Sequence, residues 1–109
     1  MTRFSDVLAR LEATIAGRVG ADPASSYTAK LLAGGPPLAG KKLAEEAVET
    51  VIAAVQADPD AVAAESADLI YHWLVLLAAA GVSLDAVAAK LEAREGVSGI
   101  TEKASRPKG

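Results

Sequence analysis

Cysteine is absent from this 109-residue chain, and histidine and tryptophan occur only once each. The lack of cysteine excludes disulfides, zinc–thiolate sites and thiol catalysis. Basic residues number 11 against 14 acidic ones, which gives a formal net charge of −3. No basic stripe is large enough for duplex nucleic acid, so we expect no nucleic-acid partner.

Long apolar runs are missing as well. The longest covers residues 69–80 and includes Tyr71 and His72, whereas a membrane span needs about 20 residues. The segment MTRFSDVLARLEATIAGR has neither a long apolar core nor a cleavage site, so no signal peptide is indicated. The sequence predicts a soluble, cytoplasmic protein of one domain with no membrane partner.

Abundant alanine, short β-branched runs and the absence of sustained two-residue alternation predict an all-α fold. The expected helices cover residues 3–16, 26–32, 38–57, 59–80 and 83–94. Between the second and third helices, Gly34-Gly35-Pro36-Pro37 is interpreted as the strongest break in the chain. Residues 96–109 are polar and contain glycine and proline, which predicts a mobile tail.

Burial of the helices predicts an oligomer. Residues 69–77 are apolar nearly all round, so that helix must be covered on several sides. A chain of this length with few helices cannot readily do so alone. Separately, the third helix has an apolar face made of Leu43, Ala44, Ala47, Val48, Val51 and Val55, with Lys42 and the three glutamates on its other side. We expect a homodimer or higher homo-oligomer that completes a helical bundle.

Five acidic residues carry the most informative pattern: Glu45-Glu46-x-x-Glu49 on the third expected helix and Glu65-x-x-Asp68 on the fourth. At roughly 100° per residue, the first three fall within one arc, and Glu65 and Asp68 lie about 60° apart. A turn between the helices would bring both faces together, where carboxylates repel unless a cation neutralises them. Oxygen ligands without cysteine suit Mg²⁺, or Mn²⁺, rather than zinc.

The ordinary alternative for one such motif is a solvated helix face. Here Lys42 is the one nearby cation of the first motif, and Asp68 runs into the most apolar segment of the chain. An unpaired carboxylate there would be costly, so the two motifs together favour a metal site.

The motif pair resembles the all-α nucleoside-triphosphate pyrophosphohydrolases, the MazG-like superfamily. Its flanks narrow the resemblance to phosphoribosyl-ATP pyrophosphohydrolase of histidine biosynthesis. They are SYTAKLL at 26–32, KLAEEAVE at 42–49, DLIYHWL at 68–74, LEAR at 91–94 and SGITEK at 98–103. The resemblance covers essentially residues 26–106, and the chain looks like the stand-alone form, without a fused cyclohydrolase.

The resemblance implies a helical bundle of the MazG-like type, completed by oligomerisation, and a Mg²⁺-dependent reaction. Phosphoribosyl-ATP and water would give phosphoribosyl-AMP and pyrophosphate by cleavage of the α–β phosphoanhydride. By family analogy Glu46, Glu49, Glu65 and Asp68 hold Mg²⁺. Glu45 is the catalytic candidate, either binding a further Mg²⁺ or orienting the attacking water.

The basic residues allow two interpretations each. Lys42 either neutralises the neighbouring carboxylates or reaches a phosphate of the substrate. Lys30 either binds the 5′-phosphate of the extra ribose or is a solvated lysine. Arg94, Lys103 and Arg106 either cover the substrate's phosphates or are surface charges.

Two further side chains are candidates for substrate binding. His72 lies one turn after Asp68 and could bind the Asp68 carboxylate, contact the substrate or simply pack in the core. Tyr27 could stack on adenine or pack in the core. Trp73 is interpreted as core or subunit interface.

Two other functions fit parts of the pattern. A housecleaning pyrophosphohydrolase acting on canonical or damaged (d)NTPs would share the metal motif but not the SYTAKLL and YHWLVLL flanks. A non-enzymatic helical module could use the acidic face to bind a basic partner, and tight Mg²⁺ binding with pyrophosphate release would exclude it.

Overall fold

The computed structural model describes residues 2–96, and within them all regular structure is helical. The helices are α1 (Arg3–Ala16), α2 (Tyr27–Ala33), α3 (Gly35–Val55), α4 (Pro59–Ala80) and α5 (Leu84–Arg94). The predicted all-α fold class is therefore confirmed. The predicted tail lies almost entirely outside the described residues, as do Lys103 and Arg106.

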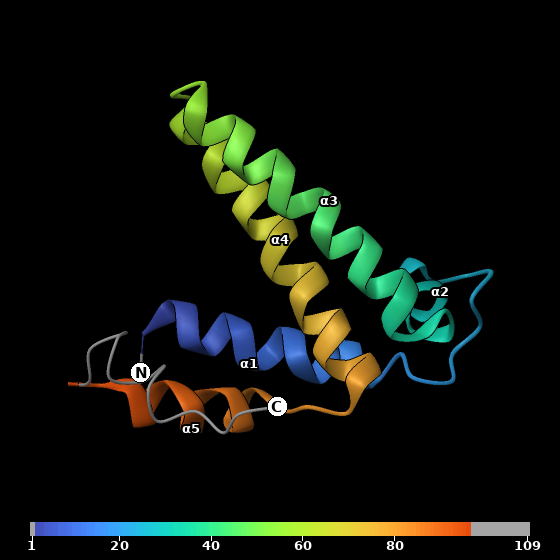
Figure 1. Ribbon diagram of the computed structural model, residues 1–109. Coiled ribbons are helices and arrows are strands. Elements are labelled where there is room, and N and C mark those ends of the chain that lie inside the picture. Colours follow the sequence, from blue (N-terminus) through green and yellow to red (C-terminus); the bar gives the residue numbers. More distant parts are fainter. Residues whose placement is uncertain (1, 97–109) are drawn as a thin grey trace, which may run out of the picture.

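A long antiparallel hairpin of α3 and α4 is the centre of the fold (Figure 1). The short α2 packs on both hairpin helices near the beginning of α3. Helix α1 packs on α4 near the C-terminal end of α4, away from the turn that joins α3 and α4. Helix α5 lies beside α1 and shares a hollow of about 390 Å³ with it. The middle of the hairpin is thus left uncovered by α1 and α5.

Local signals in the sequence explain most helix ends. The side chains of Ser26, Asp58 and Ser83 each accept a hydrogen bond from a main-chain amide in the first turn of α2, α4 and α5. Such caps satisfy donors that the helix itself leaves unpaired. Gly81 ends α4 in the left-handed conformation, with φ of 73°.

The start of α3 differs from expectation. The helix begins at Gly35 rather than at residue 38, so both prolines lie in its first turn. Proline is tolerated there because the amides of the first turn have no partner within the helix. The break is confined to Gly34 and Gly35: Gly35 has φ of 70°, and a Cβ on Gly34 would lie 2.5 Å from the Leu38 side chain. Glycine is therefore required by conformation at Gly35 and by space at Gly34.

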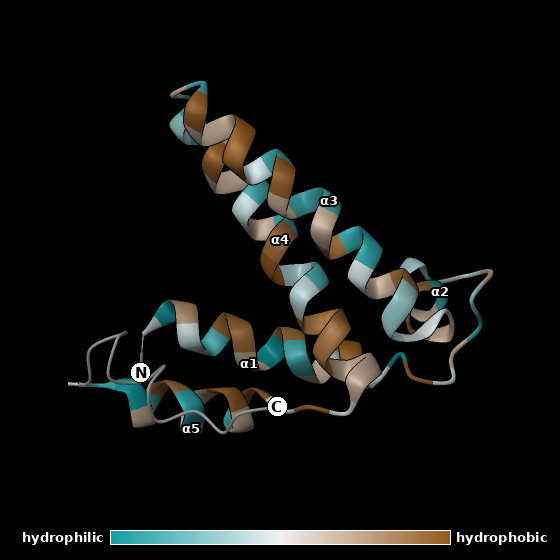
Figure 2. Ribbon diagram, in the orientation of Figure 1, coloured by the Kyte–Doolittle hydropathy of each residue, from teal (hydrophilic) through white to brown (hydrophobic). Residues whose placement is uncertain are grey.

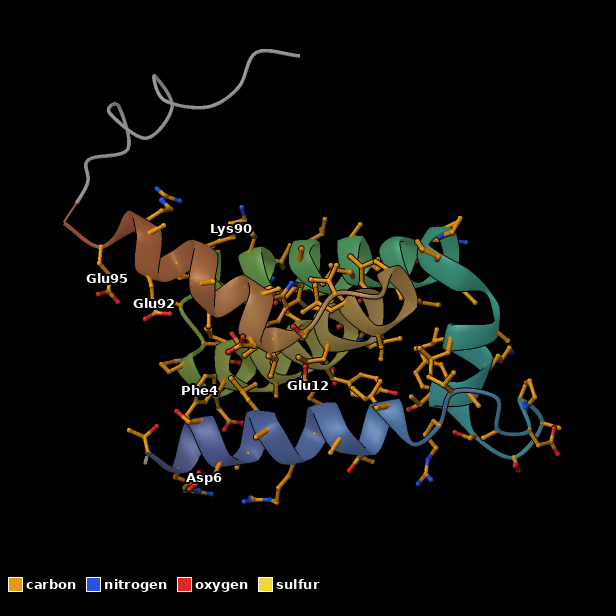
Figure 3. All side chains as sticks on the ribbon, turned by 90° about the horizontal axis from the view of Figure 1, so that it is seen from below. Phe4, Asp6, Glu12, Lys90, Glu92 and Glu95 are labelled. Carbon is orange, nitrogen blue, oxygen red and sulfur yellow. The ribbon has the colours of Figure 1, made fainter. Side chains whose placement is uncertain are left out.

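A distant side chain holds the start of α5. Glu12 of α1 accepts a hydrogen bond from the main-chain amide of Leu84 through Oε2, at 2.8 Å. Figure 3 shows Glu12 reaching from α1 into the space between the helices, whereas Asp6 points away on the outer side of α1. This contact joins the first and last helices of the described chain.

The buried core is small and lies where α1, α2, the beginning of α3 and the second half of α4 meet. Its members are Ile15, Leu31, Ala39, Leu74 and Val75. Trp73 is half-buried and packs against this cluster, in keeping with its interpretation as a core residue. The outer half of the hairpin contributes little to this core, although Figure 2 shows apolar residues along it.

The expected apolar face of α3 lies opposite Glu46, and much of it is exposed in the single chain. Four aliphatic side chains of α3 are exposed: Val48 by 59%, Val51 by 61%, Ile52 by 49% and Val55 by 81%. Ile52 extends the expected face, whereas Leu43 and Ala47 of that face are half-buried. We call the four exposed residues the valine stripe. They recur at spacings of three and four and so share one helix face. Helix α3 instead buries the face that contains Ala39 and Ala53, and Glu46 on that side is half-buried.

Among the described residues, α4 is the helix that has the length and apolar composition of a membrane span. The helix is longer than the apolar run of residues 69–80 because it also includes the more polar residues 59–68. The core helix of a soluble protein can have the same length and composition. Helix α4 also carries Glu65 and Asp68 in its middle and packs along α3.

Candidate metal centre and adjoining hollow

Three glutamates converge between the middle of α3 and the middle of α4. One carboxylate oxygen from each of Glu46, Glu49 and Glu65 lies within 4.8 Å of the others. Helix α3 presents the first two from adjacent turns, and the antiparallel α4 brings the third alongside. We call these three residues the acidic cluster. The structure thus brings together three of the four residues expected to hold a metal.

Two oxygens of the acidic cluster lack a partner. Oε2 of Glu46 and Oε2 of Glu65 are both buried and have no hydrogen bond to the described residues. A buried carboxylate oxygen without a donor is costly, because burial removes the water that would otherwise solvate it. A cation placed between the three carboxylates would supply the missing interaction.

The charges of the cluster perturb one another. Burial raises the pKa of Glu46 above its ordinary value, and the neighbouring charges of Glu49 and Asp68 raise it further. The pKa of Glu65 is raised first by the hydrogen-bonding approach of the Glu49 carboxyl group, then by burial and by nearby charges. Both shifts show that negative charge is disfavoured here without a counter-ion.

The donor chemistry of this arrangement fits a hard divalent cation. Carboxylate oxygens are the ligands that Mg²⁺ and Mn²⁺ prefer, and the cluster offers neither sulfur nor imidazole. The residues present therefore fit the metal that the sequence led us to expect.

Asp68 lies outside the acidic cluster as defined by the 4.8 Å separation, and it is exposed. Its charge nevertheless raises the pKa of both Glu46 and Glu65. Asp68 stands one helical turn after Glu65, which is consistent with a ligand at the edge of the site.

Lys42 and Glu45 lie beside the cluster on α3 and form an ion pair, with Nζ and Oε2 3.5 Å apart. Both side chains are more than a third exposed, so the pair contributes little to stability. This contact matches the interpretation in which Lys42 neutralises a carboxylate. Glu45 stands on the solvent side of the site and is not a member of the cluster.

An open hollow of about 610 Å³ lies at the beginning of α2, lined by Pro23, Ala24, Ser25, Ser26, Tyr27 and Lys30. Lys30 is exposed at its wall. Tyr27 lines the hollow and is also influenced by charged residues of α3. Burial raises the pKa of its phenol, and the charges of Lys42, Glu46 and Glu45 also act on that pKa. Tyr27 therefore lines the hollow and also interacts electrostatically with residues at the acidic cluster.

Of the three interpretations of His72, the structure bears on two: the residue is buried, and it contacts the main chain of Asp68. Its ring Nδ1 lies 2.8 Å from the main-chain carbonyl oxygen of Asp68, not from the carboxylate. Its Nε2 lies 3.2 Å from the hydroxyl of Tyr27. A second hydrogen bond joins the hydroxyls of Thr28 and Tyr71. Sequence reasoning missed Thr28 and Tyr71 as partners, although each stands next to a residue that it singled out.

Arg94 is the last residue of α5, and that end of the helix lies well away from the middle of the hairpin (Figure 1). Within the described part of one chain, Arg94 is therefore not brought to the acidic cluster. Contact with a phosphate at the cluster would require the Arg94 of another subunit or a different arrangement of α5.

The family match and the similar proteins carry equivalent descriptions. The sequence model of the family described as phosphoribosyl-ATP pyrophosphohydrolase matches residues 8–95. A phosphoribosyl-ATP pyrophosphatase of Caulobacter vibrioides is 73% identical over 104 residues, which cover 95% of this chain and 96% of the relative. Proteins of the same name from Parvibaculum lavamentivorans and Dinoroseobacter shibae are 63% and 62% identical. These matches cover 97% and 92% of this chain and 97% and 98% of the relatives.

Proposed function

The chain belongs to the phosphoribosyl-ATP pyrophosphohydrolase family, and we propose that it carries out the family's hydrolysis at the acidic cluster with bound Mg²⁺. The enzyme converts phosphoribosyl-ATP and water into phosphoribosyl-AMP and pyrophosphate, a step of histidine biosynthesis. The observation that carries the assignment of the site is the convergence of three glutamates with two buried oxygens that lack partners.

Glu46, Glu49 and Glu65 would hold the metal, with Asp68 as a fourth ligand one turn along α4. When bound, Mg²⁺ supplies charge neutralisation for the phosphate oxygens of the scissile anhydride. Glu45 stands beside the site on its exposed side, where its carboxylate can accept a proton from the attacking water and orient it. In the reaction the water oxygen bonds to phosphorus, the bridging P–O bond breaks, and pyrophosphate leaves.

The substrate is strongly anionic, and the cations nearest the site have distinct places. Lys42 is held at Glu45 and can move to a phosphate when the substrate arrives. Lys30 stands at the wall of the hollow beyond Tyr27, where it would bind the 5′-phosphate of the additional ribose. Arg94 stays a proposal for a contact made across subunits.

Assembly into a homodimer or higher homo-oligomer is part of the proposal. The valine stripe exposes four aliphatic side chains on one face of α3, and contiguous exposed apolar surface is typical of protein–protein interfaces. The opposite face of the same helix carries Glu46, so the stripe can be covered without closing the acidic cluster. A soluble nucleotide substrate is in keeping with action in the cytoplasm.

A pyrophosphate-release assay tests the assignment, with phosphoribosyl-ATP compared with ATP, dCTP and dUTP. We expect phosphoribosyl-ATP to be hydrolysed with the highest kcat/KM, and activity to disappear in EDTA and return with millimolar Mg²⁺. Equal turnover of dCTP or dUTP would indicate a housecleaning (d)NTP pyrophosphohydrolase instead.

A matched pair of variants separates site from surface charge. Glu46→Gln should abolish turnover while the helical circular dichroism is kept, because shape is conserved and charge is lost. Glu92→Gln, at an exposed position on α5, should leave activity unchanged. Full activity of Glu46→Gln would contradict the proposed site.

A further inference from the structure

Two side-chain hydrogen bonds and a set of aromatic contacts connect α2 to α4. The hydroxyl of Tyr27 lies 3.2 Å from Nε2 of His72, and Thr28 is bonded to Tyr71. The rings of Tyr27 and Tyr71 have centroids 6.5 Å apart, and that of His72 lies 6.1 Å from Tyr27. The start of α2 is thus attached to α4 one turn beyond Asp68.

For a neutral ring, the direction of the two hydrogen bonds of His72 follows from the chemistry of their partners. A carbonyl oxygen only accepts, so Nδ1 of His72, 2.8 Å from the main-chain oxygen of Asp68, must carry a proton. In the neutral ring Nε2 is then an acceptor, and the hydroxyl of Tyr27 donates to it. His72 is only 6% exposed, so its ring is held by the main chain and presents one fixed acceptor to α2.

Tyr27 stands where this contact matters for binding. Its side chain is 52% exposed, and it lines the hollow together with Ser25, Ser26 and Lys30. The hollow is polar at its wall and carries one cation, a composition suited to a phosphorylated sugar. Through its contact with His72, whose ring contacts the main chain of Asp68, Tyr27 connects this hollow to the part of α4 that carries the acidic residues.

We propose that Tyr27 and His72 form a positioning pair for the non-reacting end of the substrate. His72, fixed by the main chain at Asp68, holds the phenol of Tyr27, and the oriented ring supports the phosphorylated ribose beside Lys30 while the anhydride lies at the acidic cluster. This inference rests on the proposed function and names the part of the site that distinguishes phosphoribosyl-ATP from a plain nucleoside triphosphate.

Substitutions can remove this hydrogen bond from either side. Tyr27→Phe keeps the ring and loses the donor. His72→Asn keeps an amide donor near the position of Nδ1 but offers no acceptor to Tyr27, whereas the amide oxygen of His72→Gln can take the place of Nε2. For phosphoribosyl-ATP we expect Tyr27→Phe and His72→Asn each to raise KM about threefold to tenfold, the loss of one hydrogen bond. kcat should stay within about twofold, and His72→Gln should retain most of the wild-type KM.

The double variant measures whether the two residues act together. If they form one pair, Tyr27→Phe should raise KM no further in the His72→Asn background. KM for ATP, which lacks the second phosphorylated ribose, should change little in any of these variants. Tyr27→Phe keeps the proposal testable even if His72→Asn, at a buried position, fails to fold.

Thr28→Val is the matched control, because it removes the parallel hydrogen bond between the same two helices and keeps the side-chain shape. It should lower Tm about as much as Tyr27→Phe while leaving KM for phosphoribosyl-ATP within about twofold of wild type. Calorimetric titration with phosphoribosyl-AMP gives a second readout, independent of turnover, in which Tyr27→Phe should bind about threefold to tenfold more weakly.

The outcomes separate this inference from the proposed function. A wild-type enzyme that releases no pyrophosphate from phosphoribosyl-ATP refutes the proposed function itself. An active wild type overturns the positioning pair alone if Tyr27→Phe leaves KM unchanged, if Thr28→Val raises KM equally, or if His72→Gln behaves like His72→Asn.

Discussion

Placing a charge in the valine stripe should separate the subunits without unfolding them. Val51 stands in the centre of the stripe and is 61% exposed in the single chain. The substitution Val51→Asp changes no residue of the acidic cluster and no member of the buried core. Its effect therefore reports on association.

The exposed fractions give the magnitude of the free energy that association gains by covering the valine stripe. The exposed fractions of the four stripe residues amount together to about two and a half whole aliphatic side chains. Burying one such side chain fully contributes about 1.5–3 kcal/mol, so covering the stripe contributes about 4–7 kcal/mol per chain. Val51→Asp removes about 1–2 kcal/mol of this in each chain. It also places a carboxylate in the interface, which costs several kcal/mol more unless the carboxylate is paired.

Sedimentation equilibrium at micromolar concentration measures the result. We expect the wild type to be dimeric or larger, and the dissociation constant of Val51→Asp to rise by at least about 30-fold, since each 1.4 kcal/mol is a factor of ten. Circular dichroism should show that the variant stays helical. Val19→Asp is the control, because Val19 is 64% exposed but lies outside α3. A monomeric, folded and active wild type, or a Val51→Asp variant that associates as tightly as wild type, would refute the reasoning.

Three further predictions concern the metal, pH and the turn before α3. Mg²⁺ at 100 times its Kd should stabilise the fold by about 2.7 kcal/mol. A thermal melt should show the shift in wild type but not in Glu46→Gln; equal melting temperatures in EDTA and Mg²⁺ would exclude the site. Because the folded pKa values of Glu46 and Glu65 are raised above 4.5, their stabilising contribution is complete below that pH and is lost as pH rises through the raised values. In metal-free thermal melts from pH 4 to 8, the melting temperature of Glu46→Gln should therefore rise relative to that of wild type. A difference in melting temperature that stays constant with pH would contradict this. Gly34→Ala should destabilise by about 1–3 kcal/mol, since its Cβ would lie 2.5 Å from Leu38. Gly40→Ala, with open space in a helix, should stabilise by about 0.5–1 kcal/mol; urea unfolding compares the two, and equal effects would refute the steric argument.

The helices could be predicted from the sequence because most of their ends are set locally. Ser26, Asp58 and Ser83 act on amides three residues away, and Gly81 acts through its own backbone. The contact of Glu12 with the amide of Leu84 spans 72 residues and leaves no local pattern. The two prolines after Gly35 were misread because the same residue type breaks a helix in its interior and begins one in its first turn.

What covers the apolar face of α3 could not be predicted, for a physical reason. Hydrophobic periodicity identifies an apolar face, but it does not say whether that face meets a helix of the same chain or of another. The converging Glu46, Glu49 and Glu65 were predicted because spacing on each helix fixes a face, and the hairpin brings two faces together. The contact between Tyr27 and His72 joins residues 45 positions apart and depends on the packing of α2.

Helix α3 presents Glu46 toward α4 and the valine stripe on its other side. A rigid helix that serves two sites makes their occupancies reciprocal: if association orders the helix and favours Mg²⁺ binding, Mg²⁺ must favour association by the same factor. Diluting the protein would then weaken its binding of Mg²⁺. Specific activity would therefore decrease as the enzyme is diluted in limiting Mg²⁺, but it would stay constant in excess Mg²⁺.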